Sequence, residues 1–315
     1  MLNRRHLRIK VLQALYAYFQ SEETNHAKAE RELLSSVDRI YDLYLYLLLS
    51  FIEIKSITVA KMDDAKQKMR PSEDDLNPNM KLVNNKVIAL LENNVSLRRE
   101  SEKFNVNWVG DDTQEMLKKM VLALKDSEVY FQYMNSEESS FEEDKSFAIA
   151  LFKTDIANFP PLYTYFEDKS IHWLDDIDLA CSMVIKTLKS FSEEGDNKIM
   201  PLYKEPEEEI DFINILFRKT IVWDKENSTL IEDLTKNWEL DRIAKMDVLL
   251  MKMAITELQA FNYIPKKVTL NEYIEISKFY STPKSNGFIN GILDKAIDKL
   301  EEDNKIVKIG RGLIS

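Results

Sequence analysis

Glycine and proline are scarce in this chain: its 315 residues include only six glycines and eight prolines. A protein made of many short strands needs frequent turns, and these two residue types supply most of them. Helix-forming residues dominate the composition instead, and strict alternation of apolar and polar residues is almost absent. The sequence therefore predicts an all-α fold.

Two helical regions are predicted in the first sixty residues. The first spans about 4–21, and Asn3 is its expected N-cap. Its apolar stripe comprises Leu7, Val11, Ala14, Leu15 and Tyr18. The second region covers about 27–60 and contains the apolar run LYLYLLLSFI at 43–52. That run is too short to span a bilayer and is flanked by acidic residues, so it predicts a buried core helix.

Helices are also legible in the last third of the chain. Apolar residues at helical spacing predict a long helix over 243–261. The sequence TLNE at 269–272 fits a capping box and predicts a helix over 270–280. Another helix is expected from Gly287, as its flexible entry, to about Glu302, with Gly291 as a close-packing point. The basic tail that follows is expected to fray.

Charge is distributed unevenly along the chain. Residues 1–20 carry +4 and residues 261–315 carry +2, whereas the net charge is −11, which leaves −17 for residues 21–260. Such an acidic protein is a poor general binder of nucleic acid. Two basic ends on an acidic body can still form one local phosphate site if the fold brings them together.

Enzymatic chemistry finds little support in the sequence. The three histidines, His6, His26 and His172, have no metal-ligand spacing to each other or to a cysteine. Glycine-rich phosphate loops and nucleophile motifs are lacking, and although a carboxylate dyad is compatible with the sequence, nothing points to one. We therefore expect neither catalysis, nor a metal, nor a cofactor. The single cysteine, Cys181, and the lack of a signal peptide favour a reducing compartment, the cytoplasm.

The first helix opens with the basic stretch NRRHLRIK, which contains Arg4, Arg5 and Arg8. One interpretation is an exposed helix start. However, cations at a helix N-terminus oppose the helix dipole, and this favours a phosphate-facing role. Arginine can contact a phosphate with two hydrogen bonds. Tyr16 projects from the same side of the helix as Arg5, where it adds a stacking surface or covers the core.

A second candidate site is the stretch KFYSTPKSNGFING at 278–291. Around a helix start it combines lysines (Lys278, Lys284) with aromatic residues (Phe279, Tyr280, Phe288) and an asparagine (Asn286). Aromatic rings beside lysines are typical of single-stranded RNA binding. The alternative is a plain helix–loop–helix corner with Phe288 in the core, and composition alone favours that alternative.

Three segments resemble the NusB family of bacterial transcription antitermination factors. They are LDRIAKMDVLLMKMAITEL (240–258), IPKKVTLNEYIEISKFYS (264–281) and FINGILDKAI (288–297). The first helix, RRHLRIKVLQALYAYFQ (4–20), resembles the arginine-rich opening helix of that family, which ends in QALY. Together these segments are about as long as an ordinary NusB domain.

The resemblance implies a NusB-like bundle of two packed helical halves and a non-enzymatic role. It implies binding to the boxA element of nascent ribosomal RNA together with the ribosomal protein NusE, in the service of the RNA polymerase elongation complex, and no association with a membrane. Carried over by position, Arg4, Arg5 and Arg8 match the family's arginine-rich start and Tyr16 matches the tyrosine of QALY. Phe288 matches the phenylalanine of the final helix, which lies by the RNA surface; all five are expected to bind RNA. Lys278 and Lys284 join them as the basic residues of the corner.

The chain also departs from the family. His6 and Leu7 interrupt the arginine cluster, and Lys284 stands where many members have an acidic residue. Residues of about 62–205 have no counterpart in a minimal NusB. The predicted division is therefore an N-terminal helical half (1–61), an acidic helical insertion with linkers (62–205) and a C-terminal NusB-like domain (206–315).

Two further functions compete with RNA-dependent antitermination. The acidic insertion is compatible with a protein-interaction scaffold that binds NusE or RNA polymerase without specific RNA recognition. A NusB-like domain also precedes the catalytic domain of some rRNA cytosine methyltransferases. In this chain the resemblance ends near the C-terminus and no glycine-rich cofactor loop follows, so the methyltransferase architecture does not fit.

Overall fold

Helices build the described part of the chain. The structure is a computed structural model that describes every residue except 22–24, 171–172, 236–242 and 314–315. Within those described ranges lie fifteen α-helices and no strand. The predicted all-α class is therefore confirmed.

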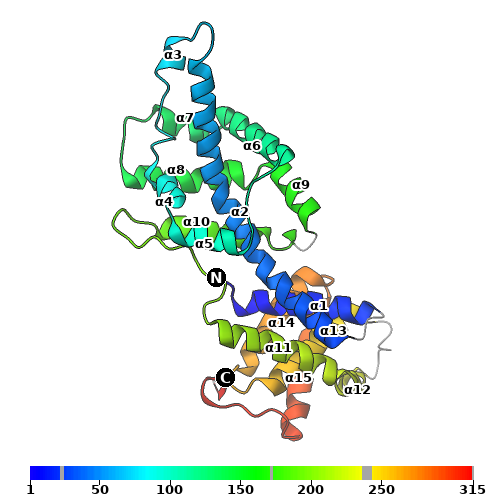
Figure 1. Ribbon diagram of the computed structural model, residues 1–315. Helices are drawn as coiled ribbons and strands as arrows, with labels where there is room; N and C mark the ends of the chain where they lie inside the picture. Colours follow the sequence, from blue (N-terminus) through cyan, green and yellow to red (C-terminus); the bar gives the residue numbers. More distant parts are fainter. Residues whose placement is uncertain (22–24, 171–172, 236–242, 314–315) are drawn as a thin grey trace. The chain divides into compact units, whose positions relative to one another are not determined.

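The chain folds into two compact units, each of which is described by itself (Figure 1). Unit 1 comprises Met1 and Asp38–Leu202, and unit 2 comprises Leu2–Val37 and Tyr203–Ser315. Helix α2 (His26–Lys66) is continuous and contributes residues to both units. The boundary between the two units falls inside this helix, between Val37 and Asp38, and the apolar run at 43–52 belongs to the core of unit 1.

Unit 1 surrounds the long helix α2 with shorter helices. They are α3 (Glu73–Leu76), α4 (Lys86–Glu92), α5 (Val95–Lys103), α6 (Asp111–Ala123), α7 (Glu128–Asn135), α8 (Phe141–Leu151), α9 (Pro160–Lys169) and α10 (Ile177–Ser190). By length and composition, α2 could cross a membrane, but 56% of its most apolar window is buried. Tyr44 in this run is buried and its hydroxyl lies 2.6 Å from the Thr187 hydroxyl on α10. The expected core helix is confirmed.

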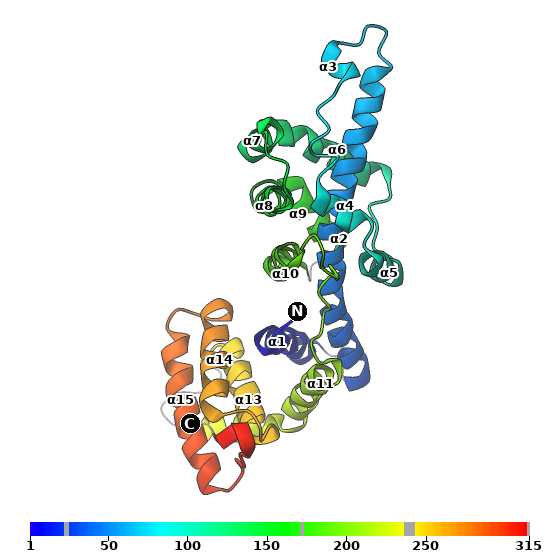
Figure 2. The same ribbon diagram turned by 90° about the vertical axis from the view of Figure 1, so that its left-hand side faces the viewer.

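Unit 2 is arranged around one central helix. Helix α13 (Lys245–Ala260) packs against α1 (Arg4–Gln20) and against four further helices of the unit (Figures 1 and 2). Those helices are α11 (Pro206–Val222), α12 (Asp224–Leu234), α14 (Lys266–Tyr280) and α15 (Ser285–Glu302). Because α1 packs on α11, α13 and α14, the two basic ends of the sequence meet in one unit.

Helix starts were predicted with mixed success. Asn3 caps α1 as expected: its side chain accepts a hydrogen bond from the backbone N–H of His6. The capping box at 269–272 is wrong, because α14 begins at Lys266, directly after Pro265. Thr269 lies inside this helix, where its buried hydroxyl donates to the Glu257 carboxylate at 2.9 Å.

The predictions for the tail and for Gly291 are also corrected. The tail is docked on the end of α13: the Lys308 ammonium donates to the carbonyls of Leu258 and Phe261 at 2.9 and 2.8 Å. A Cβ added to Gly291 would meet no atom within 4 Å, so this glycine is not a close-packing point. Gly287 is already the third residue of α15 rather than the entry to it.

Candidate nucleic-acid interface

Arg8 is a buried structural residue rather than part of an exposed basic surface. Its side chain is 2% exposed and forms two hydrogen bonds, of 2.7 and 2.6 Å, with the fully buried carboxylate of Glu257. Burial disfavours the charged guanidinium, but the charge of Glu257 outweighs burial and raises the pKa of Arg8. Arg8 is therefore removed from the RNA-facing set, because no solvent-facing phosphate can reach it.

Glu257 is the residue that sequence reasoning missed. Its two carboxylate oxygens also accept hydrogen bonds from Thr269 and Tyr273, at 2.9 and 3.1 Å. A signal was available in the sequence. Glu257 lies four residues after Met253 and four before Phe261, on the apolar face of a helix, where an ionised side chain requires a buried partner. Arg8 likewise shares a face with Leu12 and Leu15.

Arg5 lies at the rim of this network. Its guanidinium forms two hydrogen bonds of 2.9 Å to the carboxylate of Glu272 on α14, and its side chain is 40% exposed. The hydrogen bonds to Glu272 raise the pKa of Arg5. Glu272 also lies 3.5 Å from Arg8, so one carboxylate serves two arginines. Arg5 keeps an exposed edge, although most of its charge is balanced within the protein.

Arg4 points toward aromatic rings on the other side of α1. Its guanidinium lies over the ring of Phe212, 4.6 Å from the ring centre, and donates to the hydroxyl of Tyr263. It also pairs with the exposed carboxylate of Glu208 at 3.2 Å. Arg4 and Arg5, with parts of α11 and α14, line a groove of about 1100 Å³, to which Arg8 contributes only the 2% of its side chain that is exposed. We call this surface the arginine face.

The loop between α14 and α15 forms a second surface, the corner, which comprises residues 278–288. Lys278 is exposed and pairs with Glu275, whose pKa the hydrogen bond from Lys278 lowers. Lys284 is exposed, and its ammonium has no hydrogen bond or ion pair among the described residues. Phe288 is half-buried, whereas Phe279 is 80% exposed.

Helix α1 connects the two surfaces. Along α14, Arg5 pairs with Glu272, and Glu275 one turn later pairs with Lys278. Further along α1, the amide of Gln13 donates to the hydroxyl of Tyr280 at 3.4 Å. The exposed edge of Arg5 and the corner therefore lie along the same α1–α14 seam.

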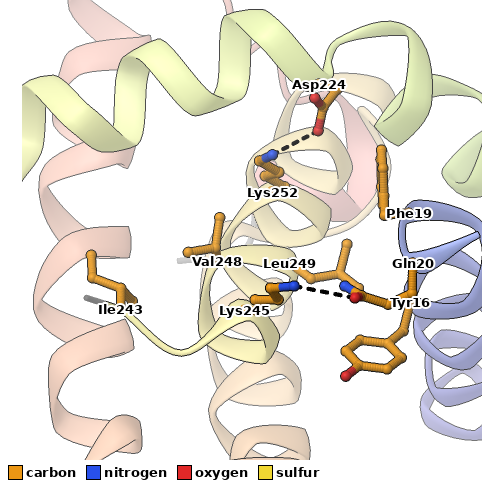
Figure 3. A pocket seen from close by; sticks show the side chains of 9 residues that line it. All are labelled: Tyr16, Phe19, Gln20, Asp224, Ile243, Lys245, Val248, Leu249 and Lys252. Atoms are coloured by element: carbon orange, nitrogen blue, oxygen red, sulfur yellow. Dashed lines mark hydrogen bonds and ion pairs between the residues drawn. The ribbon is translucent and has the colours of Figure 1, made fainter. Parts of the chain in front are cut away.

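Tyr16 lies in a different place, a groove of about 290 Å³ between α1, α12 and α13 (Figure 3). The ring is 40% exposed and lines the groove together with Phe19, Val248 and Leu249. Two lysines of α13 bridge the walls: Lys245 donates to Gln20 at 3.2 Å and Lys252 to Asp224 at 2.6 Å. We call this feature the Tyr16 groove.

The seven predicted site residues thus occupy three places. Arg4, Arg5 and Arg8 line the arginine face, Tyr16 lines its own groove, and Lys278, Lys284 and Phe288 belong to the corner. Across the described ranges, with their gaps at 22–24, 171–172, 236–242 and 314–315, no group of three or more His, Cys, Asp or Glu side chains could hold a metal ion. These three places can bind a ligand through charged side chains and through the faces of aromatic rings.

Comparison with known proteins decides the family. A model of the NusB family matches residues 171–298. The transcription antitermination protein NusB of Salinibacter ruber is 44% identical over 115 residues, which cover 36% of this chain and 71% of that protein. The chain belongs to the NusB family. This family consists of transcription antitermination factors without catalytic activity.

Two other NusB proteins give the same picture. That of Natranaerobius thermophilus is 35% identical over 103 residues, covering 31% of this chain and 74% of the relative. That of Chloroherpeton thalassium is 41% identical over 104 residues, covering 33% of this chain and 49% of the relative. No solved structure is significantly similar to this chain. In each comparison about two thirds of this NusB-family chain remain unmatched.

Proposed function

We propose that this chain promotes transcription antitermination by binding boxA-type RNA of nascent ribosomal transcripts, together with the ribosomal protein NusE, in the cytoplasmic RNA polymerase elongation complex. The observation that carries the proposal is the seam between α1 and α14. Two segments more than 250 residues apart in the chain present Arg5, Lys278 and Lys284 along one helix pair.

Physical chemistry supports an RNA backbone as the ligand of this seam. Phosphates attract lysine and arginine side chains, and the release of condensed counterions drives such binding. Arg4 and Arg5 contribute through their exposed edges only, since each already pairs with a carboxylate. The corner supplies Lys284, which has no competing acidic partner among the described residues, and Phe288 supports it from a half-buried position.

The Tyr16 groove is a better fit for a protein than for RNA. Its apolar side chains, Phe19, Val248 and Leu249, offer area for hydrophobic burial, and its bridging lysines form a polar rim. This composition is typical of a protein interface with a small apolar centre. We propose that NusE binds in this groove. Tyr16 both lines the groove and is exposed on the surface of α1.

The test is a titration of boxA-like RNA, with and without NusE, at two salt concentrations. We expect NusE to increase the affinity and added salt to reduce it steeply. A scrambled RNA of equal length serves as the control. Equal affinity for both RNAs would contradict the proposal.

The acidic net charge and the paired arginines favour a second candidate, a protein-interaction scaffold. In that function the chain would hold NusE or RNA polymerase without recognising a specific RNA. Capture of NusE together with no preference between boxA and scrambled RNA is the result that would select it.

A further inference from the structure

Three aromatic rings lie at the corner, and only one of them extends into solvent. The hydroxyl of Tyr280 accepts a hydrogen bond from Gln13, and Phe288 is half-buried. Phe279 is 80% exposed and has no ring contact among the described residues. A single exposed apolar side chain is common on protein surfaces, so its surroundings must supply the argument.

Cations flank this ring on both sides in the chain. Lys278 directly precedes Phe279, and its side chain is 46% exposed. Lys284 lies five residues after Phe279, at the position directly before α15. A nucleotide offers a flat base and a phosphate a few ångströms away from it. An exposed ring with a lysine on either side of it in the sequence matches both parts, because every base has a face that can stack on an aromatic ring and the lysines can attract the phosphates.

The backbone that carries Phe279 is held in place. The hydroxyl of Ser281 donates to the buried carboxylate of Asp247 and lies 3.0 Å from the hydroxyl of Ser285. Thr282 adds a hydrogen bond of 2.8 Å to Ser285. Binding to such a fixed turn loses less conformational entropy than binding to a flexible loop. The corner is therefore preorganised to present its ring and its lysines.

We propose that Phe279 stacks on an unpaired base of single-stranded RNA while Lys278 and Lys284 contact the adjoining phosphates. This inference rests on the proposed function and identifies the residue that stacks on a base at that site. The stacking contact tolerates any base identity but requires an unpaired base, so the corner discriminates single strands from duplex.

The experiment compares Phe279→Ala, Phe279→Leu and Phe279→Trp with the unchanged chain in binding a single-stranded boxA-like RNA. We expect alanine to weaken binding about tenfold or more, as for other base–aromatic stacks. Leucine keeps apolar area without a π face and should bind nearly as weakly as alanine. Tryptophan should retain affinity, and RNA should quench its fluorescence. The slope of log Kd against log salt should stay unchanged in all three variants, because the ring carries no charge.

A matched control comes from Phe131 on α7, which is 64% exposed in unit 1. Phe131→Ala should leave RNA affinity unchanged, and neither alanine variant should lower the melting temperature. If the unchanged chain binds RNA and Phe279→Ala or Phe279→Leu binds equally well, the stacking inference alone is overturned. If the unchanged chain binds no RNA, the proposed function fails and the inference falls with it.

Discussion

The arginine face and the corner differ in whether all of their cations are paired with carboxylates. On the arginine face each arginine has a carboxylate partner, and Arg8 is wholly buried with Glu257. At the corner, Lys278 pairs with Glu275, but Lys284 has no acidic partner among the described residues, and the exposed ring of Phe279 belongs to the same segment. The face that is richest in arginine in the sequence therefore offers less free positive charge than the corner does. Counting cations along a chain does not measure the charge that a ligand can reach.

The largest expected effect is a loss of stability when the buried ion pair beneath the arginine face, Arg8 with Glu257, is disrupted. Glu257→Gln removes the fully buried carboxylate partner of Arg8 and leaves only Glu272, at 3.5 Å, to balance its charge. Removing one partner of a buried pair costs about 3–5 kcal/mol of unfolding free energy. Urea titration measures the loss. Glu208→Gln, at the exposed partner of Arg4, is the matched control and should change stability by about 0.5 kcal/mol or less. Equal losses in both variants would show that burial does not distinguish the two pairs.

The next effect concerns the corner and appears in binding. The double change Lys278→Ala and Lys284→Ala should reduce the steepness of log Kd against log salt by about 1.4, since each single-strand phosphate contact contributes about 0.7. Melting temperature should stay the same because both side chains are exposed. Lys118→Ala with Lys119→Ala, two exposed lysines of α6, is the control. An unchanged slope would exclude the corner lysines as phosphate ligands.

A smaller effect tests the open space around Gly291, in the helix that follows the corner. Gly291→Ala should stabilise the protein by about 0.5–1 kcal/mol, because alanine favours the helix and no atom lies within 4 Å of the new Cβ. Thermal unfolding measures the gain. Gly312→Ala makes the contrast, since its Cβ would lie 2.0 Å from the carbonyl oxygen of Asn262 and should destabilise the docked tail. A loss of stability in Gly291→Ala would restore the close-packing interpretation.

The last effect is a pH dependence on the arginine-face side, where the tail meets the end of α13. Burial lowers the pKa of Lys308 to about 8. The unfolded chain, with an ordinary lysine pKa near 10.4, then binds more protons than the folded chain between these two values, so stability rises with pH in that window. In urea titrations, the free energy of unfolding of the unchanged chain should increase relative to that of Lys308→Met between about pH 7 and about pH 9.5. A decrease of this difference with rising pH would contradict the buried position of the ammonium.

Local features of the chain were predictable. Scarce glycine and proline predicted the helical class, and Asn3 predicted the start of α1, since an N-cap depends on neighbouring residues alone. The TLNE stretch shows the limit of such reasoning. Its threonine fits a cap locally, yet the hydroxyl is used by Glu257, which lies on another helix. Pro265 set the helix start instead.

The sequence by itself determined the helices, the buried run of α2 and, through its resemblance to known segments, the family. Only the tertiary structure decided which charges face water. Arg8 and Glu257 lie 249 residues apart in the chain, and the packing of α1 on α13 is what joins them. Periodicity can mark each as lying on a buried face, but pairing depends on which helices meet. For the same reason, only the structure shows that Phe279 is the most exposed aromatic ring of the corner.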